Sequence, residues 1–204
     1  RGNAYGEKGG WDKGIADYTE AVRLDSTYAE AYCNRGAAYR EKGDLDKAIA
    51  DCTEAIGLKP TLAQAYYNRG NAYGDKGDLD KAIADYTEAI RVNPTLPEPY
   101  FKRGVAYGKK GDLDKEIADY SEAIRLHPRY AEAYYNRGVA YGAKRDFDKA
   151  IADLMEAIRL NPKDSEAYYN RGVTYGKKGD LDKAKNDFAQ AKKLGLEPEK
   201  PKAK

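Results

Sequence analysis

The sequence contains few of the residues from which catalytic and metal sites are built. Its 204 residues include one histidine, one methionine and two cysteines. The histidine, His127, precedes Pro128 in an expected turn, and no serine or cysteine has a base at a spacing typical of a nucleophile. No cluster of metal ligands and no glycine-rich phosphate loop is present in the sequence. We therefore expect a protein that is not an enzyme and uses no cofactor and no metal.

Charge and hydropathy exclude two classes of partner. The 36 Lys and Arg residues nearly balance the 34 Asp and Glu residues, for a net charge of +2, whereas nucleic-acid binding needs clustered positive charge. No run of about eighteen apolar residues could span a bilayer. We expect neither nucleic acid nor a membrane as partner. Cys33 and Cys52 fit no disulfide framework. Two free thiols favour a reducing compartment such as the cytoplasm, which leaves the actual compartment open.

What the sequence has instead is a repeat. The segment Ala63–Leu96 is 34 residues long and aligns without gaps on the rest of the chain. The chain begins with a partial copy at 1–28. Five full copies follow, at 29–62, 63–96, 97–130, 131–164 and 165–198. The charged tail at 199–204 is expected to be disordered. A fixed period of this length predicts a stacked array rather than one globular core. Because the sequence begins at Arg1, without Met and inside a copy, we also expect a fragment.

Each copy predicts two antiparallel helices. In the copy Ala63–Leu96, one helical pattern covers 63–76 and a second covers 79–92. Between them, Gly77 tolerates a positive φ, and Asp78 or Asp80 can cap the second helix. The connection is short, so the two helices must be neighbours that run in opposite directions.

The residues that recur from copy to copy resemble a known pattern. Two aromatics separated by a glycine are followed by a small residue, a third aromatic and a proline: Tyr66, Gly70, Tyr73, Ala82, Tyr86 and Pro94. This pattern resembles the tetratricopeptide repeat family. The resemblance implies an all-α fold, an α-solenoid of antiparallel helix pairs that forms a right-handed superhelix. It also implies a concave face that binds segments of other proteins.

Every copy carries an arginine in its first helix and an aspartate in its second, whereas the family usually has leucine in place of the arginine. The pairs are Arg1 and Asp17, Arg35 and Asp51, Arg69 and Asp85, Arg103 and Asp119, Arg137 and Asp153, and Arg171 and Asp187. The arginine lies on the side of the first helix that faces the second. We therefore predict an Arg–Asp ion pair within each copy, or across to the next copy. The alternative is a ladder of free arginines that binds anions.

The candidate binding residues lie on the opposite side of the first helices, where stacked copies would line the groove. They are Asn34, Tyr67, Asn68, Asn71, Phe101, Lys102, Tyr135, Asn136, Tyr169 and Asn170. The recurring asparagines resemble the asparagine ladder of the O-GlcNAc transferase repeat domain, which implies that they hold the backbone of an extended peptide. An amide side chain matches the donor and acceptor of a peptide unit, and aromatic rings can bury apolar side chains. The alternative is a solvated polar face with amide bonds from helix to helix.

Two residues break the repeat where it is otherwise regular. Glu116 occupies a site between the helices at which the other full copies have alanine. A buried carboxylate needs a partner, so we expect this side chain to reach toward solvent. Arg145 stands where the other full copies have the turn glycine, and we expect a locally altered turn there.

These observations favour a protein–protein interaction scaffold that binds an extended peptide or protein segment in its concave groove. A self-associating assembly module and a regulatory arm of a larger enzyme are the alternatives. The family's dicarboxylate clamp for chaperone tails is disfavoured. Asn71 and Lys102 each match one of its elements, but its lysine position is never lysine here, and nearby glutamates such as Glu98 would repel a carboxylate.

Overall fold

The computed structural model describes residues 10–196, and within that range the chain forms eleven α-helices and no strand. The helices are α1 Gly10–Leu24, α2 Ala29–Glu41, α3 Leu45–Leu58, α4 Ala63–Lys76, α5 Leu79–Val92, α6 Pro97–Lys109, α7 Leu113–Leu126, α8 Ala131–Ala143, α9 Phe147–Leu160, α10 Ser165–Lys178 and α11 Leu181–Lys193. The first helix of the partial copy and the tail at 199–204 lie outside the described residues.

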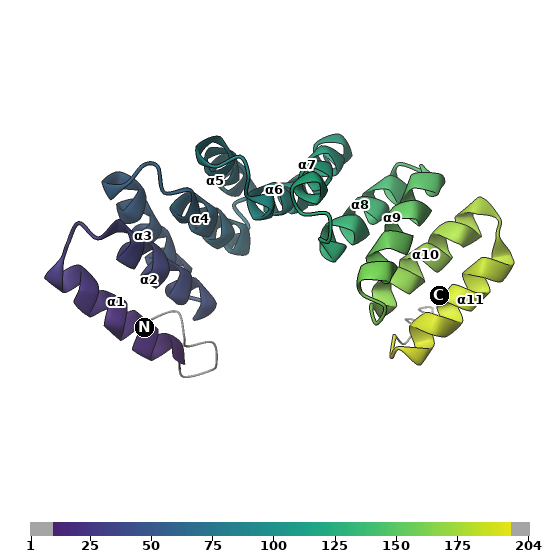
Figure 1. Cartoon of the computed structure of the whole chain (residues 1–204), viewed down its shortest axis with the longest axis horizontal. Helices are drawn as coiled ribbons and strands as arrows, with labels where there is room; N and C mark the ends of the chain where they lie inside the picture. Colours follow the sequence, from purple (N-terminus) through teal and green to yellow (C-terminus); the bar gives the residue numbers. More distant parts are fainter. Residues whose placement is uncertain (1–9, 197–204) are drawn as a thin grey trace, which may run out of the picture. The chain divides into compact units, whose positions relative to one another are not determined.

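The chain forms two compact units, Arg1–Lys110 and Gly111–Lys204, which we call unit 1 and unit 2. In unit 1, α2 packs on α3 and α4 on α5, and α3 and α5 also pack on the first helix of the next copy. In unit 2 the same holds for α8 with α9 and α10 with α11 (Figure 1). The fold is therefore an all-α solenoid of antiparallel helix pairs, as predicted.

The turn within a copy follows from two residues. Gly77 ends α4 with φ of 84°, a left-handed conformation that glycine adopts without steric cost. The side chain of Asp78 then accepts a hydrogen bond from the backbone N–H of Lys81 at 3.3 Å and caps α5. Of the two capping candidates, the structure selects Asp78 over Asp80. The predicted helix bounds, 63–76 and 79–92, are confirmed.

The turn at Arg145 corrects one expectation. Arg145 has φ of 64°, close to the φ of 85° at Gly43 and 79° at Gly111. Asp146 still caps the next helix. The backbone therefore keeps the same conformation as in the other copies, and the prediction of an altered turn was wrong. The conformation is fixed by the helices on both sides, so the arginine adopts a left-handed φ at a cost of about 1 kcal/mol.

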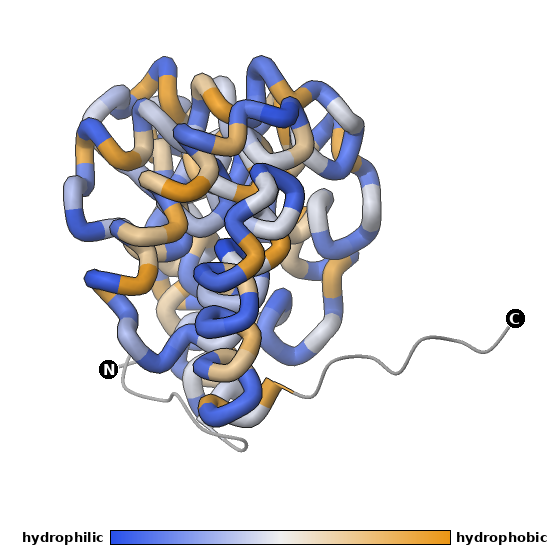
Figure 2. Tube along the Cα trace, turned by 90° about the vertical axis from the view of Figure 1, so that its right-hand side faces the viewer, coloured by the Kyte–Doolittle hydropathy of each residue, from blue (hydrophilic) through white to orange (hydrophobic). Residues whose placement is uncertain are grey.

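The core between copies is made of small side chains. Ala65 of α4 is fully buried against Cys33 and Ala55 of the preceding pair, with Tyr32 and Ile56 packed around them. Along the trace, hydrophobic residues occur in short stretches between hydrophilic ones (Figure 2). Each helix thus offers narrow apolar stripes to its neighbours, and small residues on those stripes let the backbones approach closely.

Lysine–aspartate pairs link the turns of successive copies. Lys76 contacts Asp46 at 2.6 Å between Nζ and Oδ1, and the same pairing recurs between Lys42 and Asp12, Lys110 and Asp80, Lys144 and Asp114, and Lys178 and Asp148. The side chains are largely exposed, so each pair adds about 0–1 kcal/mol of stability. The turn edge is accordingly a self-neutralised surface.

We expect Gly36→Ala to destabilise unit 1 by about 1–3 kcal/mol. A Cβ placed on Gly36 would lie 2.8 Å from the Cys52 Sγ and 3.1 Å from the Ala48 carbonyl oxygen, so α2 and α3 would have to separate. Urea unfolding followed by circular dichroism measures the change.

Gly57→Ala is the matched control, because Gly57 lies in α3 of the same copy and a Cβ there would meet no neighbouring side chain or helix within 4 Å. Removing a helical glycine there should raise stability by up to about 1 kcal/mol. Equal effects of the two substitutions would show that the close approach at Gly36 does not govern packing.

Candidate binding surface

The first helices of successive copies lie next to one another within each unit. In unit 1, α4 contacts both α2 and α6, and in unit 2, α8 contacts α10. We call the sides of these helices that face away from the second helices the first-helix surface. The predicted site residues lie on α2, α4 and α6 in unit 1 and on α8 and α10 in unit 2.

In unit 1, Asn68 holds two first helices together. Its side chain is only 8 % exposed. Its Nδ2 donates to the carbonyl oxygen of Cys33 on α2 at 3.4 Å, and its Oδ1 accepts from Nε2 of Gln64 at 2.8 Å. A ligand would have to displace these bonds to use the amide. The half-buried Asn34 occupies the equivalent place on α2.

The side chain of Asn71 forms a hydrogen bond with the tyrosine of the second helix. The hydroxyl of the buried Tyr86 donates to its Oδ1 at 2.9 Å, and the side chain of Tyr67 also bonds to Asn71. Burial raises the pKa of both tyrosines. The two rings are 6.1 Å apart between centroids. Asn71 thus links two phenols whose burial keeps them neutral, and only the half-buried Tyr67 ring remains partly open to solvent.

Of the remaining predicted residues of unit 1, Phe101 is buried and Lys102 lines a small cavity. The Nζ of Lys102 lies 5.9 Å from the ring centroid of Phe101. A cavity of about 80 Å³ is lined by Asn71, Lys102 and Lys109, among others. Arg40 and Asp75 also line it, and the Nε of Arg40 contacts Oδ2 of Asp75 at 2.6 Å. This volume admits a water molecule or the tip of a side chain.

In unit 2 the amides and rings are more accessible. The Nδ2 of Asn170 donates to the hydroxyl of Tyr135 at 2.9 Å, and that hydroxyl donates to Oε2 of Glu166 at 3.2 Å. Burial, together with the negative charge of Glu166, raises the pKa of Tyr135 to about 12. Asn136 is half-buried, whereas Tyr169 is 37 % exposed. α8 and α10 therefore present an aromatic ring and amide groups to solvent.

Val139 was not among the predicted site residues, although it occupies the same place in its copy as Asn71. It lies on α8 and is 40 % exposed, unlike most large apolar side chains of the chain. Its position is asparagine or alanine in the earlier full copies at Asn71 and Ala37, and valine in the later ones. That change of residue type was the available signal. Val139 on α8 and Tyr169 on α10 are the exposed large apolar side chains of the first helices of unit 2.

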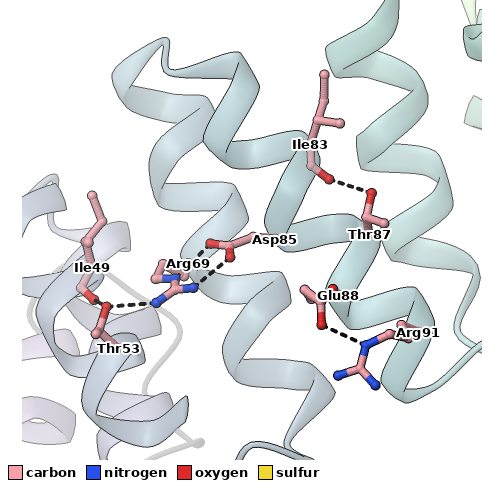
Figure 3. A network of polar contacts seen from close by, with 8 residues as sticks. All are labelled: Ile49, Thr53, Arg69, Ile83, Asp85, Thr87, Glu88 and Arg91. Atoms are coloured by element: carbon pink, nitrogen blue, oxygen red, sulfur yellow. Dashed lines mark hydrogen bonds and ion pairs between the residues drawn. The ribbon is translucent and has the colours of Figure 1, made fainter. Parts of the chain in front are cut away.

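The predicted arginine–aspartate pair is confirmed in four copies. In Figure 3, Arg69 Nε and Nη2 both contact Asp85 carboxylate oxygens at 2.8 Å, and Nη1 donates to Thr53 of the preceding copy at 3.1 Å. The same two-bond pairing joins Arg35 to Asp51, Arg137 to Asp153 and Arg171 to Asp187. These guanidinium groups are therefore structural, and they do not form an anion-binding ladder.

The groups that could suggest catalysis have structural explanations. Burial raises the pKa of the Cys33 thiol to about 11 and that of the Cys52 thiol further, so both stay protonated and poorly nucleophilic at neutral pH. Glu116 is half-buried and bonds to the Tyr120 hydroxyl. Within residues 10–196, no group of three His, Cys, Asp or Glu side chains is placed to hold a metal ion. No helix in that range is long and apolar enough to cross a membrane.

We expect Asn71→Val to destabilise unit 1 by about 1–3 kcal/mol, because it leaves the buried Tyr86 hydroxyl without a partner. In the Asn71→Val, Tyr86→Phe double variant this penalty should be largely removed. Copies with valine at this place, at Val139 and Val173, already have Leu154 and Phe188 opposite. Urea unfolding of the three variants gives the coupling, and strictly additive losses would contradict the Asn71–Tyr86 pairing.

We expect Glu116→Gln to stabilise unit 2 at neutral pH. Burial raises the pKa of Glu116 above its ordinary value of 4.5. The contribution of Glu116 to the stability of the wild-type protein is therefore fully present below about pH 4.5. It is lost as pH rises through the pKa of Glu116 in the folded state. The glutamine keeps a bond to Tyr120 without the charge. The stability difference between variant and wild type, measured by thermal unfolding from pH 4 to 8, should grow with pH; a constant difference would contradict the burial effect.

Comparison with known proteins identifies the repeat. A family model described as TPR repeat matches residues 2–43, 70–111 and 109–145. One model described as Tetratricopeptide repeat matches residues 29–62 and 131–164, and a second model with the same description matches residues 154–186. No curated protein matches the sequence.

Solved structures show the same architecture. A structure of MamA superposes with a TM-score of 0.76 at 28 % identity, covering 83 % of this chain and 98 % of that chain. Another MamA structure has a TM-score of 0.74 at 30 % identity, covering 78 % and 93 %. YrrB, described as a TPR protein with an unusual peptide-binding site, has a TM-score of 0.76 at 24 % identity, covering 87 % and 92 %.

Proposed function

This chain belongs to the tetratricopeptide repeat family, and from that premise we propose that it is a protein-interaction scaffold whose first-helix surface binds an extended segment of another protein. The observation that carries the proposal is the exposure of Val139 and Tyr169 beside the amides of Asn136 and Asn170 in unit 2. Apolar side chains of a ligand would pack on the exposed pair, and the amide of Asn136 and the Oδ1 of Asn170 would bond to its backbone. The Nδ2 of Asn170 already donates to Tyr135 and to the Glu166 carbonyl oxygen.

The predicted residues do not contribute equally to the proposed binding. In unit 1, Asn68 and Asn71 have partners inside the protein, so a ligand would gain little net energy from them. The half-buried Asn34, Tyr67 and Lys102 have more surface available there. The proposed segment therefore makes its main contacts on α8 and α10. The description of YrrB as having a peptide-binding site is consistent with such a role, but at that identity it supports the fold alone.

Self-association is the second candidate, and one feature of unit 2 favours it. Tyr169, Phe188, Ala191 and Leu196 line an apolar cavity of about 320 Å³. Phe188 is 39 % exposed, and its ring centroid lies 5.5 Å from that of Tyr169. An open apolar cavity can also receive a side chain of a second copy. Sedimentation velocity over a hundredfold range of concentration tests this candidate, and a concentration-independent monomer would contradict it.

For peptide binding, we expect the Val139→Ala, Tyr169→Ala double variant to lose at least about tenfold in affinity, the loss typical of removing central apolar contacts. A membrane array of random dodecapeptides selects ligands for the wild-type chain, and fluorescence anisotropy of the tightest peptide measures the loss. Asn136→Ala in the same assay tests the amide contribution.

Met155→Ala is the matched control. Met155 is 51 % exposed but lies on α9, a second helix, outside the proposed surface. The affinity of this variant should equal that of the wild type. Loss of affinity in the control as large as in the double variant, or equal affinities of the double variant and the wild type, would contradict binding on the first-helix surface.

A further inference from the structure

The turn between α8 and α9 departs from the repeat at several places, and the departures meet in one cavity. Arg145 replaces the turn glycine, Phe147 replaces the leucine that opens the second helix in the other full copies, and Lys177 lies on α10 of the next copy. These three side chains, with Gly142 and Ala143, line a cavity of about 390 Å³ that is open to solvent on one side. All of it lies within unit 2.

The cavity carries two positive charges. Neither Arg145 nor Lys177 makes an ion pair with any other residue of the described range, and both are exposed. The neighbouring lysines differ in this respect, because Lys144 pairs with Asp114 and Lys178 with Asp148. The acidic residues near the turn are thus already neutralised. Local charge at the cavity is therefore positive, although the whole chain is close to neutral.

The corresponding place in unit 1 has the opposite character. There the turn residue is Gly43, and Glu41 and Asp75 stand at the equivalents of Ala143 and Lys177. Both acids contact Arg40, at 2.9 Å and 2.6 Å. The positive cavity is consequently a property of one copy and not of the repeat. Arg145 itself has a left-handed backbone with φ of 64°, and such strain in a non-glycine residue is typical of functional positions.

We propose that Arg145, Lys177 and Phe147 form a subsite for an acidic side chain, either Asp or Glu or a phosphorylated residue, on the protein segment that unit 2 binds. The inference rests on the proposed function, because the cavity is lined by Gly142 and Ala143 at the end of α8, the helix that also carries Asn136 and Val139. The guanidinium of Arg145 can bind an anion through two parallel N–H groups, and Lys177 adds a point charge. Phe147 gives the stem of the acidic side chain an apolar wall.

The test compares the wild-type chain with the Arg145→Gly, Lys177→Gln double variant. This variant should fold, because the other full copies have glycine at the place of Arg145 and because the side chain of Lys177 is exposed. The control is Arg129→Gln, Lys163→Gln, which removes the same charge from two exposed residues that line no part of the cavity. The probes are dodecapeptides selected on the array, each synthesised with its acidic residue kept, changed to the amide, or replaced by phosphoserine.

We expect wild-type ligands to be enriched in acidic residues, and the amide versions to bind about tenfold more weakly. In the Arg145→Gly, Lys177→Gln variant, acidic and amide versions should bind equally, whereas the control should keep the preference. Tighter binding of phosphoserine than of Glu assigns the subsite to phosphorylated segments, and the reverse assigns it to carboxylates.

The two proposals fail in different ways. If the wild-type chain binds peptides but shows no acidic preference, or if the cavity variant keeps the preference, the subsite is overturned and the proposed function stands. If no peptide binds the wild-type chain at all, both are overturned.

Discussion

The bidentate arginine–aspartate pair is the interaction on which each repeat depends. A guanidinium between two helices needs acceptors for its N–H groups, because an unpaired buried charge is costly. Asp85 satisfies two of the donors of Arg69, and Thr53 of the preceding copy satisfies a third. The guanidinium carbon also lies 6.0 Å from the centroid of the Tyr66 ring. One side chain thereby ties together both helices of a copy and the copy before it.

The need of buried donors for acceptors also explains residues that look irregular in the sequence. In two of the copies a tyrosine on the second helix brings a hydroxyl into the core, and each of these two supplies a different acceptor. Asn71 accepts from Tyr86, while Glu116 accepts from Tyr120 in a copy that has valine at the asparagine position. Glu116 is thus neither a catalytic acid nor an error in the repeat. No buried side-chain nitrogen or oxygen within the described residues lacks a hydrogen-bond partner.

The helices, the turns and the Arg–Asp pairs could be predicted from the sequence because each rests on local, repeated signals. Asn68 could not be placed in the same way. Helical periodicity puts it on the outer side of α4, but the neighbouring helix α2 approaches closely enough to bury it to 8 % exposure. Periodicity describes one helix, whereas burial at its flanks depends on how the next helix packs. The prediction of an altered turn at Arg145 was wrong for a related reason, because the flanking helices fix the backbone conformation of the turn whichever residue occupies it.

This distinction bears on where function is found in a repeat protein. A residue shared by all copies is under the same packing demand in each, and here the shared arginines, aspartates and several asparagines are occupied by internal bonds. Residues that depart from the repeat without a packing reason are freer to serve a ligand. Val139 is exposed, whereas Val105 and Val173 at the same place in other copies are half-buried, and Arg145 keeps a charge in a strained conformation that glycine would relieve. Both lie in unit 2, so departures from the repeat, more than the repeat itself, direct attention to α8, α10 and the turn beside them.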